Sequence, residues 1–139
     1  MYDYCDEELT VMKNAMGRVV TFFDQDIKDK MYEGKSWSTI CDTIINYLPK
    51  EVYISFDIDG LNPKLCPSTG TPVAGGLEFE QVIFLIKKVV KSGRKIIGFD
   101  LNEVAPGHDD WDANVAARLL YQLSNWMAVS QGKLKAVDP

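Results

Sequence analysis

The sequence predicts an α/β fold in which helices cover both faces of a mostly parallel sheet, a three-layer αβα arrangement. Stretches with apolar residues at helical spacing alternate along the chain with short β-branched or aromatic runs, which is typical of such folds. The 139 residues are 46% apolar and 25% charged, as in ordinary globular proteins, and suffice for one core. We therefore expect residues 1–139 to form a single domain.

The first fifty residues carry a helix, a strand and a second helix. Apolar residues at helical spacing from Leu9 to Met16 predict a helix that Gly17 ends. The β-branched and aromatic run of residues 18–23 predicts a strand. An apolar stripe over residues 37–48, preceded by the N-cap candidate Ser36, predicts the second helix.

The remaining residues continue the alternation. Mostly apolar segments at residues 51–56 and 95–101 predict two strands. Residues 60–76 are rich in Pro and Gly, which predicts an ordered loop rather than a helix or strand. Helical stripes over residues 79–90 and 115–127 predict the last two helices.

Charge and cysteine content exclude several classes of protein. The net charge is −5 and Lys and Arg do not cluster, which argues against nucleic acid and membrane surfaces as partners. No apolar run approaches the ~20 residues that span a bilayer, and the acidic start from Met1 to Asp6 is not a signal peptide. Cys5, Cys41 and Cys66 are odd in number and widely spaced, so we expect free thiols in a cytoplasmic protein.

Acidic residues follow both strands of the second half. Ligands of parallel sheets bind beyond the carboxyl ends of the strands, where Asp57, Asp59 and Glu103 lie. Side chains two apart on an extended segment point the same way, so we expect Asp57 and Asp59 to converge. Their repulsion favours a divalent cation such as magnesium, calcium or manganese. The alternative is a pair of acids that end a strand, one of them capping a turn.

Two known types of site match parts of this pattern. An EF-hand is excluded because Leu61, Asn62 and Ser68 stand where it needs a ligand, a glycine and an acid. The tetrapeptide Asp57-Ile58-Asp59-Gly60 resembles the nucleophile motif of haloacid-dehalogenase-like phosphatases, although Leu61 replaces their usual threonine. Asp109-Asp110 resembles their later acidic pair but follows no clear strand.

A longer resemblance is to the ureohydrolases, the family of arginase, agmatinase and formimidoylglutamase. Its motifs are Ser55-Phe56-Asp57-Ile58-Asp59-Gly60-Leu61-Asn62-Pro63, Pro67-Ser68-Thr69-Gly70-Thr71-Pro72, Gly75-Gly76-Leu77 and Gly98-Phe99-Asp100-Leu101-Asn102-Glu103-Val104-Ala105-Pro106. The resemblance is strong over residues 51–126, whereas residues 1–50 fit only by their pattern of elements. Asn62, where the family often has Asp, and Glu78, where it has a Ser or Thr cap, depart from it.

The resemblance implies a partial arginase-like fold and a hydrolase of linear amidines or guanidines that releases urea or formamide. Such enzymes hold two Mn²⁺ ions and a bridging hydroxide that attacks the guanidinium or amidine carbon. By position, Asp57 would bridge both metals, Asp59 would bind one, and Glu103 would contact the substrate. Thr71 would position that glutamate or the substrate. A solvated loop acid at Glu103 and a turn hydroxyl at Thr71 are the alternatives.

The family's remaining metal ligands are missing from this sequence. They come from a Gly-Gly-x-His and an Asp-Ala-His-x-Asp motif, and the single histidine, His108, corresponds to neither, so we expect it to be an exposed loop residue. We therefore expect the C-terminal portion of a ureohydrolase that is inactive alone, with Met1 not its natural start. The alternative is a non-catalytic binding or assembly domain. Arginine, agmatine and formimidoylglutamate stay open as substrates, and an unpaired sheet edge predicts a homo-oligomer.

Overall fold

The computed structural model describes residues 5–135 of the chain. Residues 1–4 lie outside the described residues. They are part of the acidic start, Met1 to Asp6, for which a signal peptide was excluded from the sequence. The chain divides into two compact units, Met1–Tyr47 and Leu48–Pro139, each of which is described by itself.

The first unit is helical. It contains α1 (Asp6–Asn14), α2 (Asp24–Tyr32) and α3 (Trp37–Asn46). Ser36 caps α3 as predicted, because its hydroxyl oxygen accepts a hydrogen bond from the Thr39 N–H at 3.2 Å. The buried side chains of α3 are Ile40, Cys41 and Ile45. The predicted helices at both ends of this unit are therefore confirmed.

The strand predicted for residues 18–23 is wrong, since this segment is irregular. Val19 and Val20 are 48% and 42% exposed, so their β-branched side chains gain little from packing. A strand also needs a neighbouring backbone to pair with its N–H and C=O groups, and the composition of a segment does not show whether such a neighbour is present. The helix α2 that follows was missed because it is highly charged and buries only Ile27.

The second unit contains a parallel pair of strands, as predicted. β1 (Glu51–Asp57) and β2 (Lys95–Asn102) pair in the register that sets Asp57 beside Asn102 at the carboxyl ends. The register shifts between Val52 and Tyr53. A parallel pair needs a long crossover connection, which the loop after β1 and the helix α4 (Phe79–Lys91) provide.

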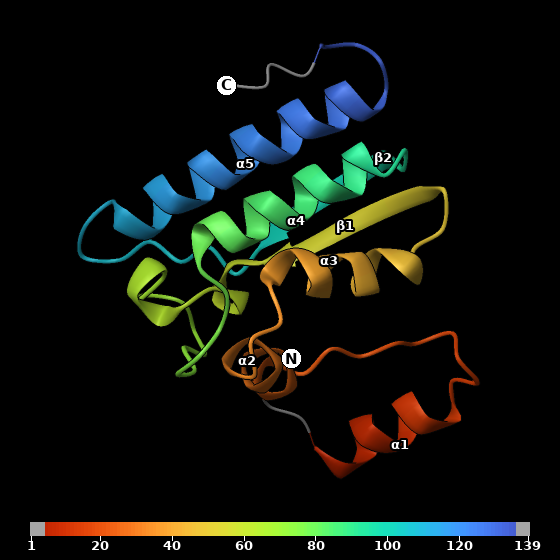
Figure 1. The fold of residues 1–139 in the computed structure, drawn as a ribbon. Helices are drawn as coiled ribbons and strands as arrows, with labels where there is room; N and C mark the ends of the chain where they lie inside the picture. Colours follow the sequence, from red (N-terminus) through yellow and green to blue (C-terminus); the bar gives the residue numbers. More distant parts are fainter. Residues whose placement is uncertain (1–4, 136–139) are drawn as a thin grey trace. The chain divides into compact units, whose positions relative to one another are not determined.

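Two helices cover this sheet. α5 (Trp111–Ser130) packs along β2, and α4 packs along α5, as Figure 1 shows. The end of α5 is tied to β2, because the Ser130 hydroxyl accepts from the Ile96 N–H at 3.0 Å and the Gln131 amide donates to the Ile96 carbonyl at 2.9 Å. The buried apolar residues of the helices are Val82, Ile86 and Val89 on α4, and Val115, Ala116, Leu119 and Leu123 on α5.

The segment between β1 and α4 is an ordered loop, as predicted. It contains two short 3₁₀ helices, η1 (Ile58–Gly60) and η2 (Pro63–Leu65). The ends of the loop meet at a bridge between Leu61 and Leu77, where the Asn62 N–H donates to the Leu77 carbonyl at 2.9 Å. A Cβ on Gly76, which has φ +80°, would lie 2.5 Å from the Leu61 carbonyl oxygen, so this closure requires glycine.

Candidate functional site

Asp57 and Asp59, the two aspartates predicted for the site, have different backbone conformations. Asp57 is the last residue of β1 and is exposed. At the fully buried Ile58 the chain turns into η1, closed by a 3.0 Å bond from the Leu61 N–H to the Ile58 carbonyl. Asp59 lies within this turn and is half-buried. The expectation that Asp57 and Asp59 share one extended segment is therefore wrong, whereas the convergence of their carboxylates stays a prediction.

Thr71 returns from the far side of the loop to Asp59. Its hydroxyl donates to Asp59 Oδ2 at 3.0 Å, across twelve residues of sequence. A hydrogen bond to a carboxylate is charge-assisted and strong for its kind. The structure thus brings together two of the residues predicted for the site, and the role of Thr71 toward Glu103 or a substrate stays a prediction.

Glu103 follows β2 directly and lies at the same edge of the sheet as Asp57, because Asp57 pairs with Asn102. It is exposed and has φ +62°, a left-handed conformation that is rare for a residue with a long side chain. Such backbone strain costs free energy and collects at functional sites. The conformation of Glu103 is an independent reason to place it in the site.

The described residues supply only part of a metal centre. Carboxylate oxygens are the right donors for manganese. However, residues 5–135 contain no group of three or more His, Cys, Asp or Glu side chains that could hold a metal ion. His108 lies exposed in the loop before α5, as predicted. Asp57 and Asp59 therefore fit the metal in kind but not in number.

A polar cluster on the sheet adjoins the site and was missed from the sequence. Asp100 on β2 accepts hydrogen bonds from the Ser55 hydroxyl at 2.8 Å and from the Asn102 amide at 2.6 Å. The Ser55 hydrogen bond is the main cause that lowers the pKa of Asp100, whereas hydrogen bonding to Asp100 raises the pKa of Tyr53. Only the pairing of Ser55 with Asp100 across the strands brings these residues together.

The loop is anchored to the start of α5 by a buried carboxylate that sequence reasoning also missed. Asp112 is 1% exposed, and its Oδ2 accepts from the Ser68 N–H at 3.0 Å. Nearby, the Trp111 indole N–H donates to the Lys64 carbonyl at 3.0 Å. These bonds join residues more than forty positions apart, a separation that no local pattern reports.

The two departures from the family pattern contact each other. The Asn62 side-chain amide donates to Glu78 Oε1 at 3.1 Å, and Lys64 forms a salt bridge with the same oxygen at 2.9 Å. The Glu78 N–H in turn donates to Gln81 Oε1 at 2.9 Å at the start of α4. Asn62 thus suits Glu78, because an aspartate at that position would place two carboxylates together.

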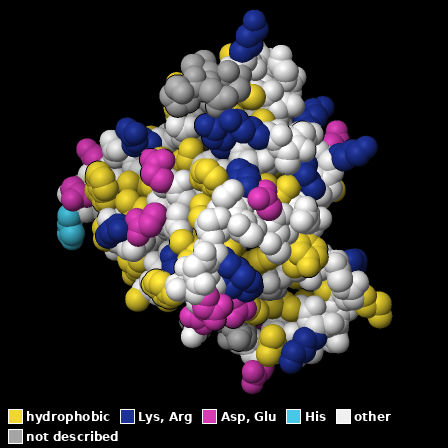
Figure 2. Space-filling view, in the orientation of Figure 1, with side chains coloured by type: hydrophobic (Ala, Val, Ile, Leu, Met, Phe, Trp, Pro, Cys, Tyr) yellow, Lys and Arg dark blue, Asp and Glu magenta, His cyan; other side chains and the backbone are white. Residues whose placement is uncertain are grey.

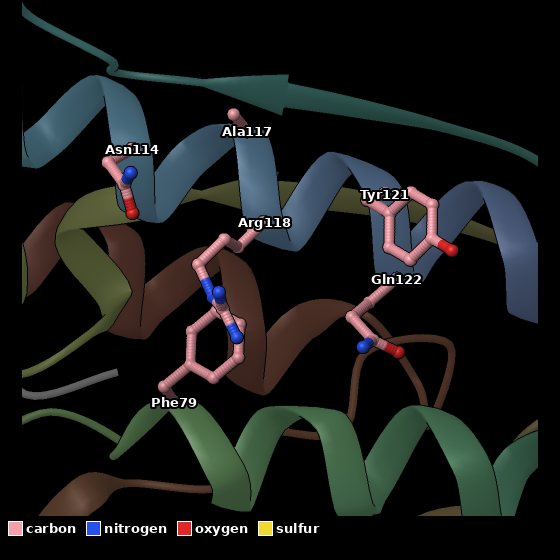
Figure 3. Close-up of a pocket in the computed structure, with 6 residues that line it drawn as sticks. All are labelled: Phe79, Asn114, Ala117, Arg118, Tyr121 and Gln122. Carbon is pink, nitrogen blue, oxygen red and sulfur yellow. The ribbon is translucent and has the colours of Figure 1, made fainter.

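A hollow on the described surface lies elsewhere on this unit. It is an open groove of about 320 Å³ between the start of α4 and the outer face of α5. Figure 3 shows Phe79 from α4 opposite Arg118 and Tyr121 from α5. The predicted site residues do not line it.

The distribution of charge and the apolar character of the helices agree with what the composition suggests. Lys and Arg side chains are interspersed with Asp and Glu on the face in Figure 2. None of the helices in residues 5–135 is long and apolar enough to cross a membrane. Cys41 and Cys66 are buried, Cys5 is exposed, and these three cysteines form no disulfide.

Comparison with known proteins decides the family. Residues 11–125 match the Arginase family. The chain belongs to the arginase family. The likeness to haloacid-dehalogenase-like phosphatases is therefore confined to Asp57-Ile58-Asp59-Gly60, and the resemblance to ureohydrolases is confirmed.

Relatives and solved structures agree with this membership. The chain is 38% identical over 93 residues to N(1)-aminopropylagmatine ureohydrolase of Thermus thermophilus. The aligned region covers 67% of this chain and 31% of that protein. It is similar to proclavaminate amidino hydrolase from Streptomyces clavuligerus, with 32% identity and a TM-score of 0.61 over 68% of the chain and 32% of that structure.

The arginase from Bacillus subtilis has the same fold. Its TM-score is 0.70 at 23% identity, over 85% of this chain and 40% of that one. The predicted fold class is therefore confirmed. This arginase-family chain spans about a third of the length of curated relatives that it matches.

Proposed function

We propose that the chain forms part of a manganese-dependent hydrolase of linear guanidines or amidines. The observation that carries the proposal is the placement of three acidic residues at one edge of a parallel sheet. Asp57 ends β1, Asp59 follows it under a hydrogen bond from Thr71, and Glu103 follows β2. Membership of the arginase family makes this edge the expected place for the reaction.

The carboxylates divide into two roles under this proposal. Asp57 and Asp59 supply oxygen ligands to manganese, which, when bound, makes hydroxide available near neutral pH. Glu103 binds the planar cation of the substrate, because a carboxylate and a guanidinium form paired, charge-assisted hydrogen bonds. Thr71 keeps the Asp59 carboxylate in one orientation. The two aspartates are too few to hold a metal pair, so the centre needs ligands from a further segment.

The chain by itself is therefore proposed to be inactive, and two assays test this. With Mn²⁺ added, the 139-residue chain is expected to release neither urea nor formamide above background. The second assay uses a chimera in which the matched third of the Thermus enzyme is replaced by the corresponding residues of this chain. This chimera is expected to hydrolyse its substrate with Mn²⁺.

Variants of the chimera assign the residues. Asp59→Asn and Glu103→Gln are expected to lower turnover by at least on the order of a hundredfold, because each removes a charge at the reacting group. Asp109→Asn is the matched control, since Asp109 is an exposed loop acid whose Oδ1 accepts from the Trp111 N–H, as an asparagine oxygen can. A folded chimera that shows no turnover would favour the alternative, a non-catalytic binding or assembly domain.

Substrate choice is tested on the same chimera. Arginine, agmatine, N(1)-aminopropylagmatine and formimidoylglutamate share a planar amidine or guanidine group, which Glu103 would bind in each. Urea is the product expected from the first three and formamide the product expected from the last. Equal loss of all activities in Glu103→Gln is expected, since the shared group is what this residue contacts.

We also propose that the chain self-associates and acts in the cytoplasm. Tyr53 and Ile97 on the two strands are 58% and 53% exposed, and strands with apolar exposed faces and open edges favour pairing. Light scattering is expected to give a mass above that of one chain at high concentration. The buried thiols of Cys41 and Cys66 suit a reducing compartment, which a fluorescent fusion in cells would test.

A further inference from the structure

The loop between β1 and α4 is held at three separate points. Its ends meet at the bridge between Leu61 and Leu77. Its first half is tied back to η1, because the buried Cys66 thiol donates to the Ile58 carbonyl at 3.3 Å. Its centre is tied to α5, because Asp112 Oδ2 accepts from the Ser68 N–H. The contact between Asp112 and Ser68 thus joins the start of α5 to the loop that carries Thr71.

Asp112 is an unfavourable choice if stability alone is at stake. The side chain is 1% exposed, and in residues 5–135 its second oxygen, Oδ1, has no hydrogen-bond partner. The hydroxyl of Thr69, next to Ser68, is also buried without a partner in this part of the chain. Buried polar atoms without partners destabilise a fold, whereas apolar residues of similar volume do not. A negative charge in the first turn of α5 is favourable, but the oxygen without a partner points to a role of the carboxylate beyond stability.

The bond from Asp112 acts at a short distance from the proposed site. Ser68 is three residues before Thr71, and the intervening residues, Thr69 and Gly70, follow Pro67 in a segment that Pro72 closes. Proline restricts the backbone on either side of this segment. Holding the Ser68 N–H therefore restricts where Thr71 can lie, and Thr71 donates to Asp59 Oδ2.

We propose that Asp112 is a positioning residue that orders the Asp59 carboxylate through Ser68 and Thr71. It touches neither metal nor substrate. It holds the loop so that the Thr71 hydroxyl stays on Asp59 and keeps that side chain in one rotamer. The inference rests on the proposed function only for the importance of Asp59; the order of the side chain itself is independent of metal and of turnover.

The test compares the χ1 rotamer of Asp59 in variants of the metal-free 139-residue chain, using three-bond NMR couplings. Wild type is expected to show one rotamer. Thr71→Val removes the hydroxyl at similar volume and is expected to give averaged couplings. Asp112→Leu fills the same buried space without an acceptor and is expected to give the same averaging, with amide exchange at Ser68 faster by on the order of tenfold.

Two further variants separate positioning from a structural role. Asp112→Asn keeps an oxygen acceptor for the Ser68 N–H and is expected to leave the Asp59 rotamer single. In the Asp112→Leu, Thr71→Val double variant the averaging is expected to be no greater than in Thr71→Val alone, because both changes act through one contact. A merely structural role would change the midpoint of unfolding without changing the couplings of Asp59.

Three results would overturn the inference. The first is a single Asp59 rotamer in Thr71→Val, which is informative whether or not any Asp112 variant folds. The second is a single rotamer in Asp112→Leu, or in Asp112→Ala if the leucine variant does not fold, despite faster exchange at Ser68. The third is additive averaging in the double variant. An inactive chimera with an ordered Asp59 would refute the proposed function and leave this inference standing.

Discussion

Glu103 offers a direct test of whether strain in the backbone serves the site. With φ +62°, the residue is in a conformation that costs about 1–2 kcal/mol for any side chain with a Cβ. Glycine adopts it freely but loses about 0.5–1 kcal/mol more conformational entropy on folding. Glu103→Gly is therefore expected to increase the free energy of unfolding by about 0.5–1 kcal/mol.

The measurement is urea-induced unfolding of the chain, with the midpoint and slope fitted separately. An unchanged slope with a higher midpoint is the expected result, since the surface exposed on unfolding does not change. Val104→Gly is the matched control. Its φ is not positive, so the same substitution one residue later is expected to lower the free energy of unfolding by at least about 0.5 kcal/mol.

In the chimera the same substitution is expected to abolish turnover, because it removes the carboxylate that we propose to bind the guanidinium. A more stable but inactive variant is the pattern of a residue kept for function at the expense of stability. The reasoning is refuted if Glu103→Gly lowers stability as much as Val104→Gly does. That outcome would mean that the carboxylate contributes to folding and that its backbone conformation is not a cost.

Three other substitutions test the loop and the polar cluster. Asn62→Asp is expected to lower the free energy of unfolding by about 0.5–1 kcal/mol, because the new carboxylate would face the carboxylate of Glu78. Glu78→Gln is expected to restore this free energy in a double-mutant cycle. Ser55→Ala removes the main hydrogen bond that lowers the pKa of Asp100, so ¹³C NMR titration is expected to show this pKa moving up toward its ordinary value. The lowered pKa in the folded state contributes stability above the unfolded pKa that is lost as the pH falls through the folded one, and this acid-dependent loss is expected to shrink in Ser55→Ala. Gly76→Ala is expected to lower the unfolding midpoint in thermal melts by an amount equivalent to about 2–3 kcal/mol, since its Cβ would meet a carbonyl oxygen at 2.5 Å, and an unchanged midpoint would contradict the closed loop.

Elements with a buried face were predictable from the sequence, and α1, which has no buried residue, was still predicted from the helical spacing of Leu9 and Met12. β1, β2, α3, α4 and α5 all bury apolar residues, and each was expected within a few positions of where it lies. The segment of residues 18–23 has the composition of a strand, but the decisive factor is a neighbouring backbone. The helix α2 buries only Ile27, so its periodic signal is weak.

The residues of the candidate site were likewise predictable only in part. Asp57, Asp59, Thr71 and Glu103 were found because they occupy fixed places in a motif, and the parallel pairing of the strands brings Glu103 to the edge where Asp57 lies. The turn at Ile58 was not foreseen, since an apolar residue between two acids fits a strand equally well. Asp112 was missed because its role depends on contact with residues more than forty positions away.

The bridge between Leu61 and Leu77 makes the segment between them a closed ring at the base of the sheet. The entropic cost of joining the two ends is offset by this bridge, and it grows only slowly with the number of residues inside the ring. Insertions or deletions between positions 63 and 75 can therefore reshape the surroundings of Asp59 while β1 and α4 stay where they are. Under the proposed function, changes within this ring could alter substrate preference without refolding the strand and helix that flank it.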